Sequence, residues 1–476
     1  MYKDKIQLFI DGQWVDGPDQ KEIVNPATGK TIGALASAGT ADLDSALIAA
    51  DRAFNQWKTS TAAHRWEILS RAADFLSQRK NAVATIVTME NGKTLSEALG
   101  EVAFCVDAIR WYAEEGKRLY GRVIPSRNPA VRQTVIKEPV GPALGFAAWN
   151  FPAGNVTLKI AGALAAGCSV IIKPSDETPA TAAAIVQCFH DAGAPAGTVN
   201  LVFGAAAPIS EHLIRSPIPK KVSLTGSTPV GKLLQTLAAD TLKRCTMELG
   251  GHAPVIVFED ADLDLSLDRL VAAKYRNAGQ VCTSPTRFFV HERLYEQFIA
   301  GFVERVKRIQ VGNGLDTGTT MGPLTLERRL DIMDQLTSDA VHKGAGLVMG
   351  GKRLDGAGFF YAPTVLRDVP DDAMIMNDEP FGPIAPITSF KNFDEVLHRA
   401  NALPFGLASY VFTKSAAHAR NAGNQLNAGQ VAVNHTSVHE PETPFGGVNE
   451  SGYGSESGIE GLEAYTRLKL LTERFD

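Results

Sequence analysis

The sequence predicts an α/β protein of two or three domains. The chain has 476 residues, which is too long for one hydrophobic core. Residues 139–250 repeat a short apolar strand and a helix, with strands at 143–148, 169–173, 198–202 and 221–224 and helices at 156–166, 178–191, 209–214 and 230–237. This alternation is typical of a parallel sheet with right-handed crossovers, so we expect a Rossmann-like dinucleotide-binding domain with its ligand at the carboxyl ends of the strands.

The region before this repeat is expected to be mostly helical. Residues 7–15 predict a hairpin around Asp11-Gly12, and residues 25–30 predict a turn. From residue 41 to about residue 116 the apolar residues follow a helical period, with one long amphipathic run over 62–78 and another that opens at Thr94.

Two segments resemble exposed strands that lie apart from both α/β regions. Residues 121–137 interrupt the helical region, and residues 465–473 end the chain. They can pair with each other or with another subunit, and left unpaired they would be aggregation-prone edges. We therefore expect a homodimer or a homotetramer. Between them, residues 252–435 continue with strands, helices and glycine turns, which indicates a second α/β domain.

Composition excludes several classes of protein. Hydrophobic residues make up 45% of the chain and charged residues 21%, with a formal net charge of −5, so neither a nucleic acid nor a membrane is an expected partner. The five cysteines form no C-x-x-C pair, which predicts neither a metal site nor a disulfide framework. Without a recognisable signal peptide or an apolar run of membrane-spanning length, we expect the protein to be cytoplasmic.

Cys282 is the first candidate for chemistry. It follows Gly279-Gln280-Val281, between a helical run that ends at Tyr275 and a β-prone run that starts at Thr286. A thiol at such a junction can act as a nucleophile beside free main-chain N–H groups. The alternative is a small buried apolar residue, which this segment alone favours. A second thiol, Cys245, is expected to lie in the core.

Three further motifs each allow two interpretations. Asn150, between two aromatic residues, is either an oxyanion donor or a turn residue. Glu248, in a glycine-rich apolar surrounding, is either a base of raised pKa or a paired surface carboxylate. Glu379, before a proline, belongs either to a tight turn or to a ribose site.

Two strand ends are candidates for cofactor contacts. Gly226 and Ser227 open a helix after a strand, where backbone N–H groups favour a phosphate, although an ordinary capped turn fits equally. Lys173 and Asp176 stand at the end of another strand, where an adenosine ribose would lie, although a helix start with Asp176 or Glu177 in its first turn fits equally. A carboxylate there repels a 2′-phosphate and favours NAD, while Lys173 and Ser175 leave NADP open.

Together and in this order, the motifs resemble the aldehyde dehydrogenase superfamily over essentially the whole chain. The segments are Trp149-Asn150-Phe151-Pro152, Lys173-Pro174-Ser175, Thr225-Gly226-Ser227-Thr228, Glu248-Leu249-Gly250-Gly251, Gly279-Gln280-Val281-Cys282, Glu379-Pro380-Phe381-Gly382-Pro383 and Pro444-Phe445-Gly446-Gly447. The spacings from Glu248 to Cys282 and from Cys282 to Glu379 are also similar to those of the family.

The resemblance implies a role for each matched residue. Cys282 would attack the aldehyde, Asn150 and the Cys282 N–H would bind the oxyanion, and Glu248 would activate the hydrolytic water. Lys159 and Glu456 match positions of a proton path. NAD or NADP would contact Trp149, Lys173, Ser175, Asp176, Gly226, Ser227, Leu249, Glu379 and Phe381. No metal is implied.

Within the superfamily the chain is most similar to the succinate and α-ketoglutarate semialdehyde enzymes. Arg276 resembles an arginine that binds a substrate carboxylate, and Phe151 and Thr283 would also contact substrate. Leu158 stands where those enzymes have a second arginine, and Glu440, near the expected mouth, would repel an anion. Arg276 could instead bond protein carboxylates at a helix end. The expected substrate is a small acidic semialdehyde.

The resemblance also divides the chain into three parts. Residues 1–118 and 139–250 would bind NAD(P), residues 251–448 would form the catalytic domain, and residues 119–138 and 449–476 would form a small β oligomerisation element. Two alternatives are a CoA-acylating relative, which Glu248 disfavours, and a non-catalytic binding protein on the same scaffold.

Overall fold

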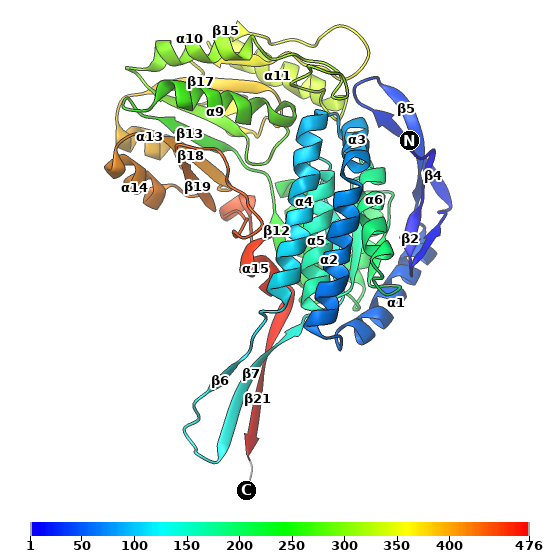
Figure 1. The fold of residues 1–476 in the computed structure, drawn as a ribbon. Helices are drawn as coiled ribbons and strands as arrows, with labels where there is room; N and C mark the ends of the chain where they lie inside the picture. Colours follow the sequence, from blue (N-terminus) through cyan, green and yellow to red (C-terminus); the bar gives the residue numbers. More distant parts are fainter. Residues whose placement is uncertain (1, 475–476) are drawn as a thin grey trace.

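The computed structural model describes residues 2–474 and contains two large sheets with helices packed against them. Figure 1 shows the first sheet with its helices at the right, the second at the upper left, and a narrow β arm that projects away from both. Each large sheet has its own hydrophobic core. The predicted α/β fold class is therefore confirmed.

The first sheet has eight strands and contains all four strands of the predicted repeat. In spatial order they are β20 (Gly452–Tyr453), β12 (Arg244–Glu248), β11 (Lys221–Thr225), β8 (Ala143–Ala147), β9 (Val170–Pro174), β10 (Val199–Leu201), β2 (Leu8–Ile10) and β3 (Gln13–Val15). The strands from β12 to β10 are parallel, and β2 and β3 form the predicted hairpin. The chain runs outward from β8 to β10 and then returns to β11, so the order reverses between β8 and β11. In parallel sheets such a reversal opens a ligand crevice at the carboxyl ends.

The helices packed around the first sheet begin and end close to their predicted limits wherever limits were predicted, and the last of them, near the C-terminus, was not predicted. They are α1 (Thr40–Trp57), α2 (Ala62–Gln78), α3 (Lys80–Asn91), α4 (Leu95–Gly116), α5 (Pro152–Ala166), α6 (Pro179–Asp191), α7 (Ala206–Arg215), α8 (Thr228–Ala239) and α15 (Gly458–Glu463). The Thr61 side chain accepts from the His64 N–H, so α2 starts at residue 62 as predicted. Thr94 and Glu97 form a reciprocal capping box at the start of α4.

The second sheet has seven strands. In spatial order they are β15 (Gly346–Met349), β16 (Thr364–Arg367), β17 (Ile384–Phe390), β14 (Pro285–His291), β13 (Ala253–Val257), β18 (Ala408–Phe412) and β19 (Gln430–Val433). Its helices are α9 (Leu263–Tyr275), α10 (Tyr295–Val306), α11 (Arg328–His342), α12 (Met374–Asn377), α13 (Phe393–Ala400) and α14 (Ala416–Gln425). The change of sheet between β12 and β13 supports the predicted boundary near residue 250, which stays a prediction.

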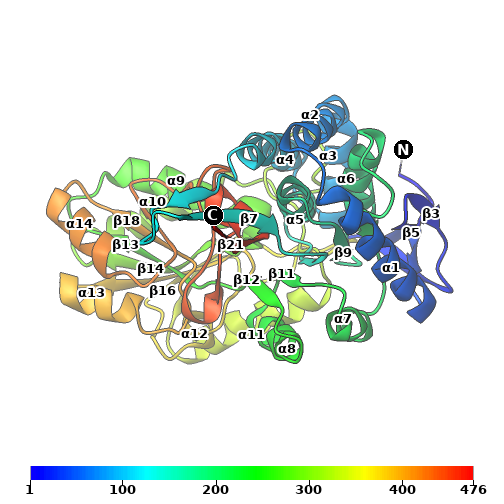
Figure 2. The same cartoon turned by 90° about the horizontal axis from the view of Figure 1, so that it is seen from below.

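The projecting arm is a three-stranded antiparallel sheet, β21 (Thr466–Arg474), β7 (Val131–Pro139) and β6 (Arg122–Ile124). The two isolated strand segments therefore pair with each other. Figure 1 shows the arm standing clear of the helices, and Figure 2 looks along it, with β7 and β21 in front of the rest of the molecule. The predicted segment 449–476 joins it only from residue 466, because β20 pairs with β12 in the first sheet and α15 packs against α5.

A second three-stranded sheet was not predicted. It joins β1 (Lys5–Ile6), β5 (Lys30–Ser37) and β4 (Asp19–Asn25), and the predicted turn at 25–30 connects β4 to β5. Only the last residues of β4 are buried, so the segment lacks a strong alternation of apolar and polar residues. None of the helices in residues 2–474 combines the length and apolar character needed to cross a bilayer.

Candidate active site

Cys282 lies in the predicted junction between α9 and β14. The chain leaves α9 through a 3-10 turn, η1 (Arg276–Gly279), in which Asn277, Ala278 and Gly279 all have left-handed φ values of 49°, 52° and 75°. A β-carbon at Gly279 would lie 2.1 Å from the carbonyl oxygen of Gly382, so only glycine fits there. This strained turn brings the Cys282 thiol, which is partly buried, to the wall of a cavity.

The cavity has a volume of about 410 Å³ and brings together residues from both halves of the molecule. Of the residues predicted for catalysis or substrate binding, Asn150, Phe151, Glu248, Arg276, Cys282 and Thr283 all line it, together with Leu158 and Glu456. Lys159 does not line it. The chain positions of Asn150 and Glu248 at the ends of β8 and β12 explain this convergence, because parallel strands present their carboxyl ends at one edge.

Glu248 is a buried carboxyl group with an uncommon environment. Its Oε1 has no hydrogen-bond partner among residues 2–474. Burial, and to a smaller extent the charge of Glu456, raises its pKa to about 8, while Lys159 and a hydrogen bond to the Cys282 thiol act in the opposite direction. The alternative of a paired surface glutamate is therefore wrong, and the group can exchange a proton near neutral pH.

The Cys282 thiol is protonated at rest. Burial, with the nearby carboxylates of Glu248 and Glu379, raises its pKa well above the usual value. Arg276 acts in the opposite direction but does not prevail. Since the thiolate is the nucleophilic form, the thiol needs a base, and Glu248 is in contact with it.

Asn150 has a buried side chain whose orientation is fixed by a residue that we did not predict. Asn155, on the first turn of α5, donates one N–H to the Asn150 side-chain oxygen at 3.3 Å and to the carbonyl of Ala148 at 3.2 Å. With its oxygen engaged in this way, Asn150 presents its amide N–H₂ as a donor. The signal in the sequence is weak, because an asparagine in a helix is usually exposed.

Lys159 and Glu456 form a buried ion pair behind Glu248. The Lys159 ammonium donates to Glu456 Oε1 at 2.5 Å and to the Thr225 hydroxyl at 2.6 Å, and Ser223 donates to the same carboxylate oxygen at 3.1 Å. Glu456 lines the cavity, so the pair connects it to polar groups on β11.

The predicted phosphate and ribose contacts lie at the carboxyl ends of β11 and β9. Ser227 is the exposed N-cap of α8 and makes no side-chain capping bond, so first-turn N–H groups are available to an anion. Lys173 donates to Asp176 at 3.0 Å, and Asp176 also accepts from the Gly204 N–H and faces Lys21 at 3.6 Å. Two lysines therefore offset the Asp176 charge, which weakens our argument from repulsion of a 2′-phosphate. The Ser175 hydroxyl bonds Glu177.

The remaining predicted cofactor residues gather around Glu379. Its carboxylate accepts from the Gly251 N–H at 3.2 Å, and burial raises its pKa to about 7. A β-carbon on Gly250 would lie 2.6 Å from this carboxylate, and one on Gly231 would meet Leu249 at 2.6 Å. The rings of Trp149 and Phe381 meet edge to face at 5.5 Å. These glycines allow close packing of Glu379 and Leu249, and the cofactor contacts of this group stay predictions.

Arg276 is exposed and carries an unpaired charge. Its guanidinium lies 5.0 Å from the centre of the Phe151 ring and has no ion-pair or hydrogen-bond partner within residues 2–474. The alternative that Arg276 bonds protein carboxylates is therefore wrong. Glu440 does not line the cavity, but its carboxylate accepts at 3.0 Å from Ser437, which does, so the repulsion of an anion by Glu440 stays a prediction.

Two expectations concern groups outside this site. Cys245 is half-buried rather than in the core, because it sits near the start of β12 and bonds the Lys243 carbonyl. No group of three or more metal-ligating side chains occurs in the part of the chain that the structure describes.

The fold and the cavity define a class, a dinucleotide-dependent oxidoreductase with a nucleophilic cysteine. The chain belongs to the aldehyde dehydrogenase family, whose model matches residues 14–471. A 4-(hydroxymethyl)benzenesulfonate dehydrogenase of Comamonas testosteroni is 45% identical over 98% of this chain and 97% of its own. A 3-sulfolactaldehyde dehydrogenase of Pseudomonas putida is 41% identical over 98% and 96%. The crystal structure of a succinate-semialdehyde dehydrogenase from Burkholderia pseudomallei has a TM-score of 0.97 and 39% identity over 99% and 98%.

The family confirms the predicted activity at the level of the reaction. The protein is an enzyme that oxidises an aldehyde to the carboxylate and uses NAD(P).

Proposed function

We propose that the enzyme oxidises aldehydes that carry an anionic group, a carboxylate or a sulfonate, at the end remote from the carbonyl. The observation that supports this most is the unpaired guanidinium of Arg276 at a cavity that also holds Cys282. A planar guanidinium binds carboxylates and sulfonates through paired N–H donors. Leu158 lines the same cavity, so a second arginine is absent there and Arg276 acts alone on the anion.

The size of the cavity extends this proposal beyond the small semialdehydes that we expected. An apolar cavity of about 150 Å³ accommodates benzene. The present cavity, of about 410 Å³, is walled in part by the rings of Phe104, Phe151, His439 and Phe445. The named substrates of the similar enzymes, a substituted benzenesulfonate, sulfolactaldehyde and succinate semialdehyde, share an acidic group, and one of them contains a ring. Both linear and aryl anionic aldehydes are therefore candidates.

The reaction begins with proton transfer from Cys282 to Glu248. The thiolate attacks the aldehyde carbon, a carbon–sulfur bond forms, and the carbonyl electron pair moves to oxygen to give a thiohemiacetal. The Asn150 amide and the Cys282 N–H donate to this oxygen. When bound, NAD(P) supplies the acceptor for the hydride that leaves the former carbonyl carbon. Ser227 and the α8 N-terminus would hold its pyrophosphate, Lys173 and Asp176 its adenosine ribose, and Glu379 its nicotinamide ribose.

Glu248 then acts on water. Glu248 first releases the proton that it took from Cys282, toward Glu456 and Lys159. Cys282 now carries the acyl group as a thioester, and the Glu248 carboxylate takes a proton from a water molecule, whose oxygen attacks the acyl carbon and expels the thiolate. The proton taken from water leaves Glu248 by the same groups. This route makes a free carboxylate and needs no CoA, so the CoA-acylating alternative is disfavoured.

Replacing Arg276 tests the substrate proposal. In Arg276→Gln, we expect kcat/KM for 4-carboxybenzaldehyde and succinate semialdehyde to fall about 10- to 100-fold, since a charge-assisted contact contributes about 1.5–3 kcal/mol. Benzaldehyde should change by less than about threefold, because it has no anionic group for Arg276 to bind. The assay is NAD(P)H formation, with Arg269→Gln, an exposed arginine on α9, as the control. An equal loss of kcat/KM on all three aldehydes would contradict the proposal.

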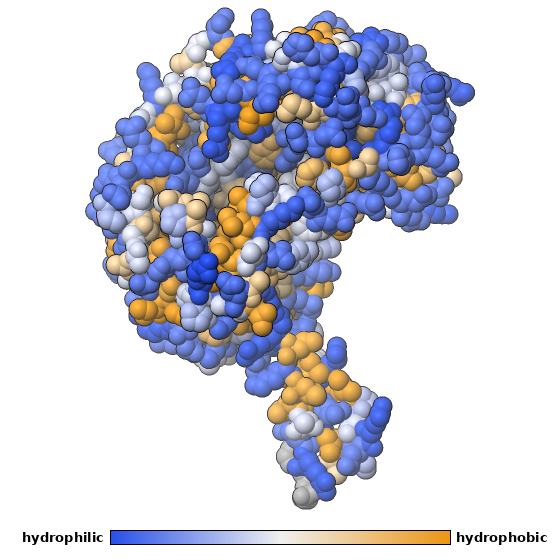
Figure 3. All heavy atoms as spheres, turned by 180° about the vertical axis from the view of Figure 1, so that it is seen from behind, coloured by the Kyte–Doolittle hydropathy of each residue, from blue (hydrophilic) through white to orange (hydrophobic). Residues whose placement is uncertain are grey.

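We also propose that the arm joins copies of the chain into a dimer or a tetramer. Several apolar side chains on it are exposed, including Val123 (63%), Leu468 (62%) and Leu470 (56%). Figure 3 shows hydrophobic atoms gathered on the arm. Exposed apolar surface of this kind marks an interface.

Charged substitutions on the arm test this assembly. Leu468→Asp combined with Leu470→Asp should lower the molar mass measured by light scattering to that of a smaller species. The matched control is Leu347→Asp, on an exposed leucine of the edge strand β15. A monomeric wild-type protein would contradict the proposal.

A cytoplasmic location, supported by the five free cysteines, is likewise proposed and is checked by cell fractionation.

A further inference from the structure

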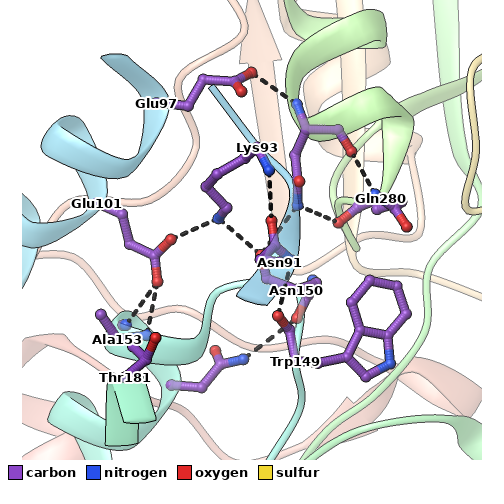
Figure 4. Close-up of polar contacts among 12 residues, drawn as sticks. Asn91, Lys93, Glu97, Glu101, Trp149, Asn150, Ala153, Thr181 and Gln280 are labelled. Atoms are coloured by element: carbon purple, nitrogen blue, oxygen red, sulfur yellow. Dashed lines mark hydrogen bonds and ion pairs between the residues drawn. The ribbon is translucent and has the colours of Figure 1, made fainter. Parts of the chain in front are cut away.

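A buried polar network joins the two halves of the molecule in the wall of the cavity, which Lys93, Glu97 and Glu101 help to line. It is built on the start of α4 and on the Gly92-Lys93-Thr94 connection before it. Lys93 is 1% exposed, and its ammonium donates to Glu101 Oε2 at 2.5 Å and to the Asn150 carbonyl at 2.8 Å. Figure 4 shows the Lys93 side chain extending between Glu101 and Asn150. None of these three α4-region residues, Lys93, Glu97 or Glu101, has a role in the reaction described above.

One set of hydrogen bonds in the network holds the backbone around Asn150. Asn91 donates to the carbonyl of Trp149 at 3.0 Å, and Lys93 donates to the next carbonyl, that of Asn150. Glu101 accepts from the N–H groups of Ala153 and Gly154 at 2.8 and 3.1 Å, so it caps α5 directly after Asn150. Each peptide around Asn150 is therefore tied to the α3–α4 region.

A second set of hydrogen bonds holds η1, the turn that precedes Cys282. Glu97 Oε1 accepts from the N–H of Asn277, the first left-handed residue of η1, at 2.7 Å. Asn277 in turn donates its side-chain N–H to the Asn150 carbonyl at 3.0 Å, which is the oxygen that Lys93 also binds. Gln280 donates to the Asn277 carbonyl at 3.0 Å and so closes the turn.

The two sets of hydrogen bonds share one acceptor, the carbonyl oxygen of Asn150. Asn150 belongs to the first sheet and Cys282 to the second half, so the two donors of the oxyanion site are carried by separately packed cores. Their separation must stay within a fraction of an ångström, because a misplacement of about 1 Å costs about 10²-fold in rate. Lys93 bonds Asn150, which belongs to the first half, and Glu97 bonds Asn277, which belongs to the second half.

We propose that Glu97 and Lys93 are positioning residues that set the Asn150 amide and the Cys282 N–H at the spacing which the oxyanion requires. They line the cavity and act through the backbone groups that they bind, the Asn150 carbonyl and the Asn277 N–H. The inference rests on the proposed function of Asn150 and Cys282. Its consequence is that their loss slows thiohemiacetal formation and hydride departure while binding of the aldehyde and of NAD(P) is retained.

The decisive experiment compares variants of Glu97 in a pre-steady-state burst assay. In Glu97→Ala the rate of the NAD(P)H burst should fall about 10- to 100-fold, with KM for aldehyde and cofactor within about threefold of wild type. Glu97→Gln keeps an oxygen that accepts from Asn277 and should recover most of the rate. Glu114→Ala removes a half-buried glutamate from the same helix, where it bonds Trp66, and should leave the burst rate unchanged.

A second variant guards against misfolding. Removing Lys93 alone would leave the Glu101 charge buried and unpaired, so Lys93→Met is combined with Glu101→Gln, and the same loss of burst rate with retained KM is expected. The inference is overturned if Glu97→Ala keeps a burst rate within about twofold of wild type, or if Glu114→Ala matches its loss. A wild-type enzyme that forms no NAD(P)H with any anionic aldehyde would instead overturn the proposed function, and the inference with it.

Discussion

Cys282→Ala is expected to reduce aldehyde-dependent NAD(P)H formation by a factor on the order of 10⁴ or more, with the fold intact. The variant has no atom that can form the carbon–sulfur bond, so neither thiohemiacetal nor thioester exists. Because Cys282 is only partly buried, loss of its sulfur leaves at most a small cavity, and the thermal unfolding midpoint should stay close to that of wild type.

Cys245→Ala provides the matched control. This cysteine is also partly buried and lies close to Glu248 in sequence, but its sulfur bonds the Lys243 carbonyl and does not line the cavity. Its activity should stay within about twofold of wild type, as is usual for a substitution away from the reacting groups. Substantial turnover in Cys282→Ala, or an equal loss in both variants, would remove Cys282 as the nucleophile.

Glu248→Gln is expected to separate the two halves of the reaction. Steady-state turnover should fall about 10²- to 10⁴-fold, the usual contribution of a general base. In the variant an amide, which does not accept a proton from water, replaces the Glu248 carboxylate. Because Glu248 also takes the Cys282 proton, the burst should become slower, but hydrolysis should be slowed more, so about one NAD(P)H per site forms before the slow steady rate. Rapid mixing with detection of NAD(P)H measures both phases, and Glu114→Gln serves as control.

The pH dependence of hydrolysis follows from the same residue. Burial raises the pKa of Glu248 to about 8, so the carboxylate that accepts protons is the minor form below that pH and the major form above it. Wild-type turnover, where hydrolysis limits it, should therefore rise as the pH increases through about 8. In Glu248→Gln this rise should disappear. A variant with a normal steady rate and the wild-type pH profile would contradict the assignment.

Local patterns predicted the parts of the fold that depend on local physics. The period of apolar residues located α2 to within its observed ends, and the alternation of strands and helices predicted the parallel pairings of β8 to β11. The strand β12 was not predicted, because its exposed Arg244 and half-buried Cys245 break the apolar run. The sheet of β1, β4 and β5 was missed for the same reason.

The active-site residues with a motif were predicted, and those without one were not. Cys282 and Glu248 stand in characteristic segments. The contact from Lys93 to Asn150 spans 57 positions, and that from Glu97 to Asn277 spans 180. Contacts of this kind follow from how two cores pack together, which no local pattern encodes. The free charge of Arg276 could likewise be recognised only once its surroundings were known.

The covalent intermediate on Cys282 offers the most direct test of the mechanism. Glu248→Gln is mixed with 4-carboxybenzaldehyde and NAD or NADP, quenched in acid, and analysed by intact-protein and peptide mass spectrometry. We expect a mass increase equal to one 4-carboxybenzoyl group on the peptide that contains Cys282, and none when the cofactor is omitted, since the thiohemiacetal reverts on quenching. A variant that forms NAD(P)H and benzene-dicarboxylate while Cys282 stays unmodified at every time point would contradict the account.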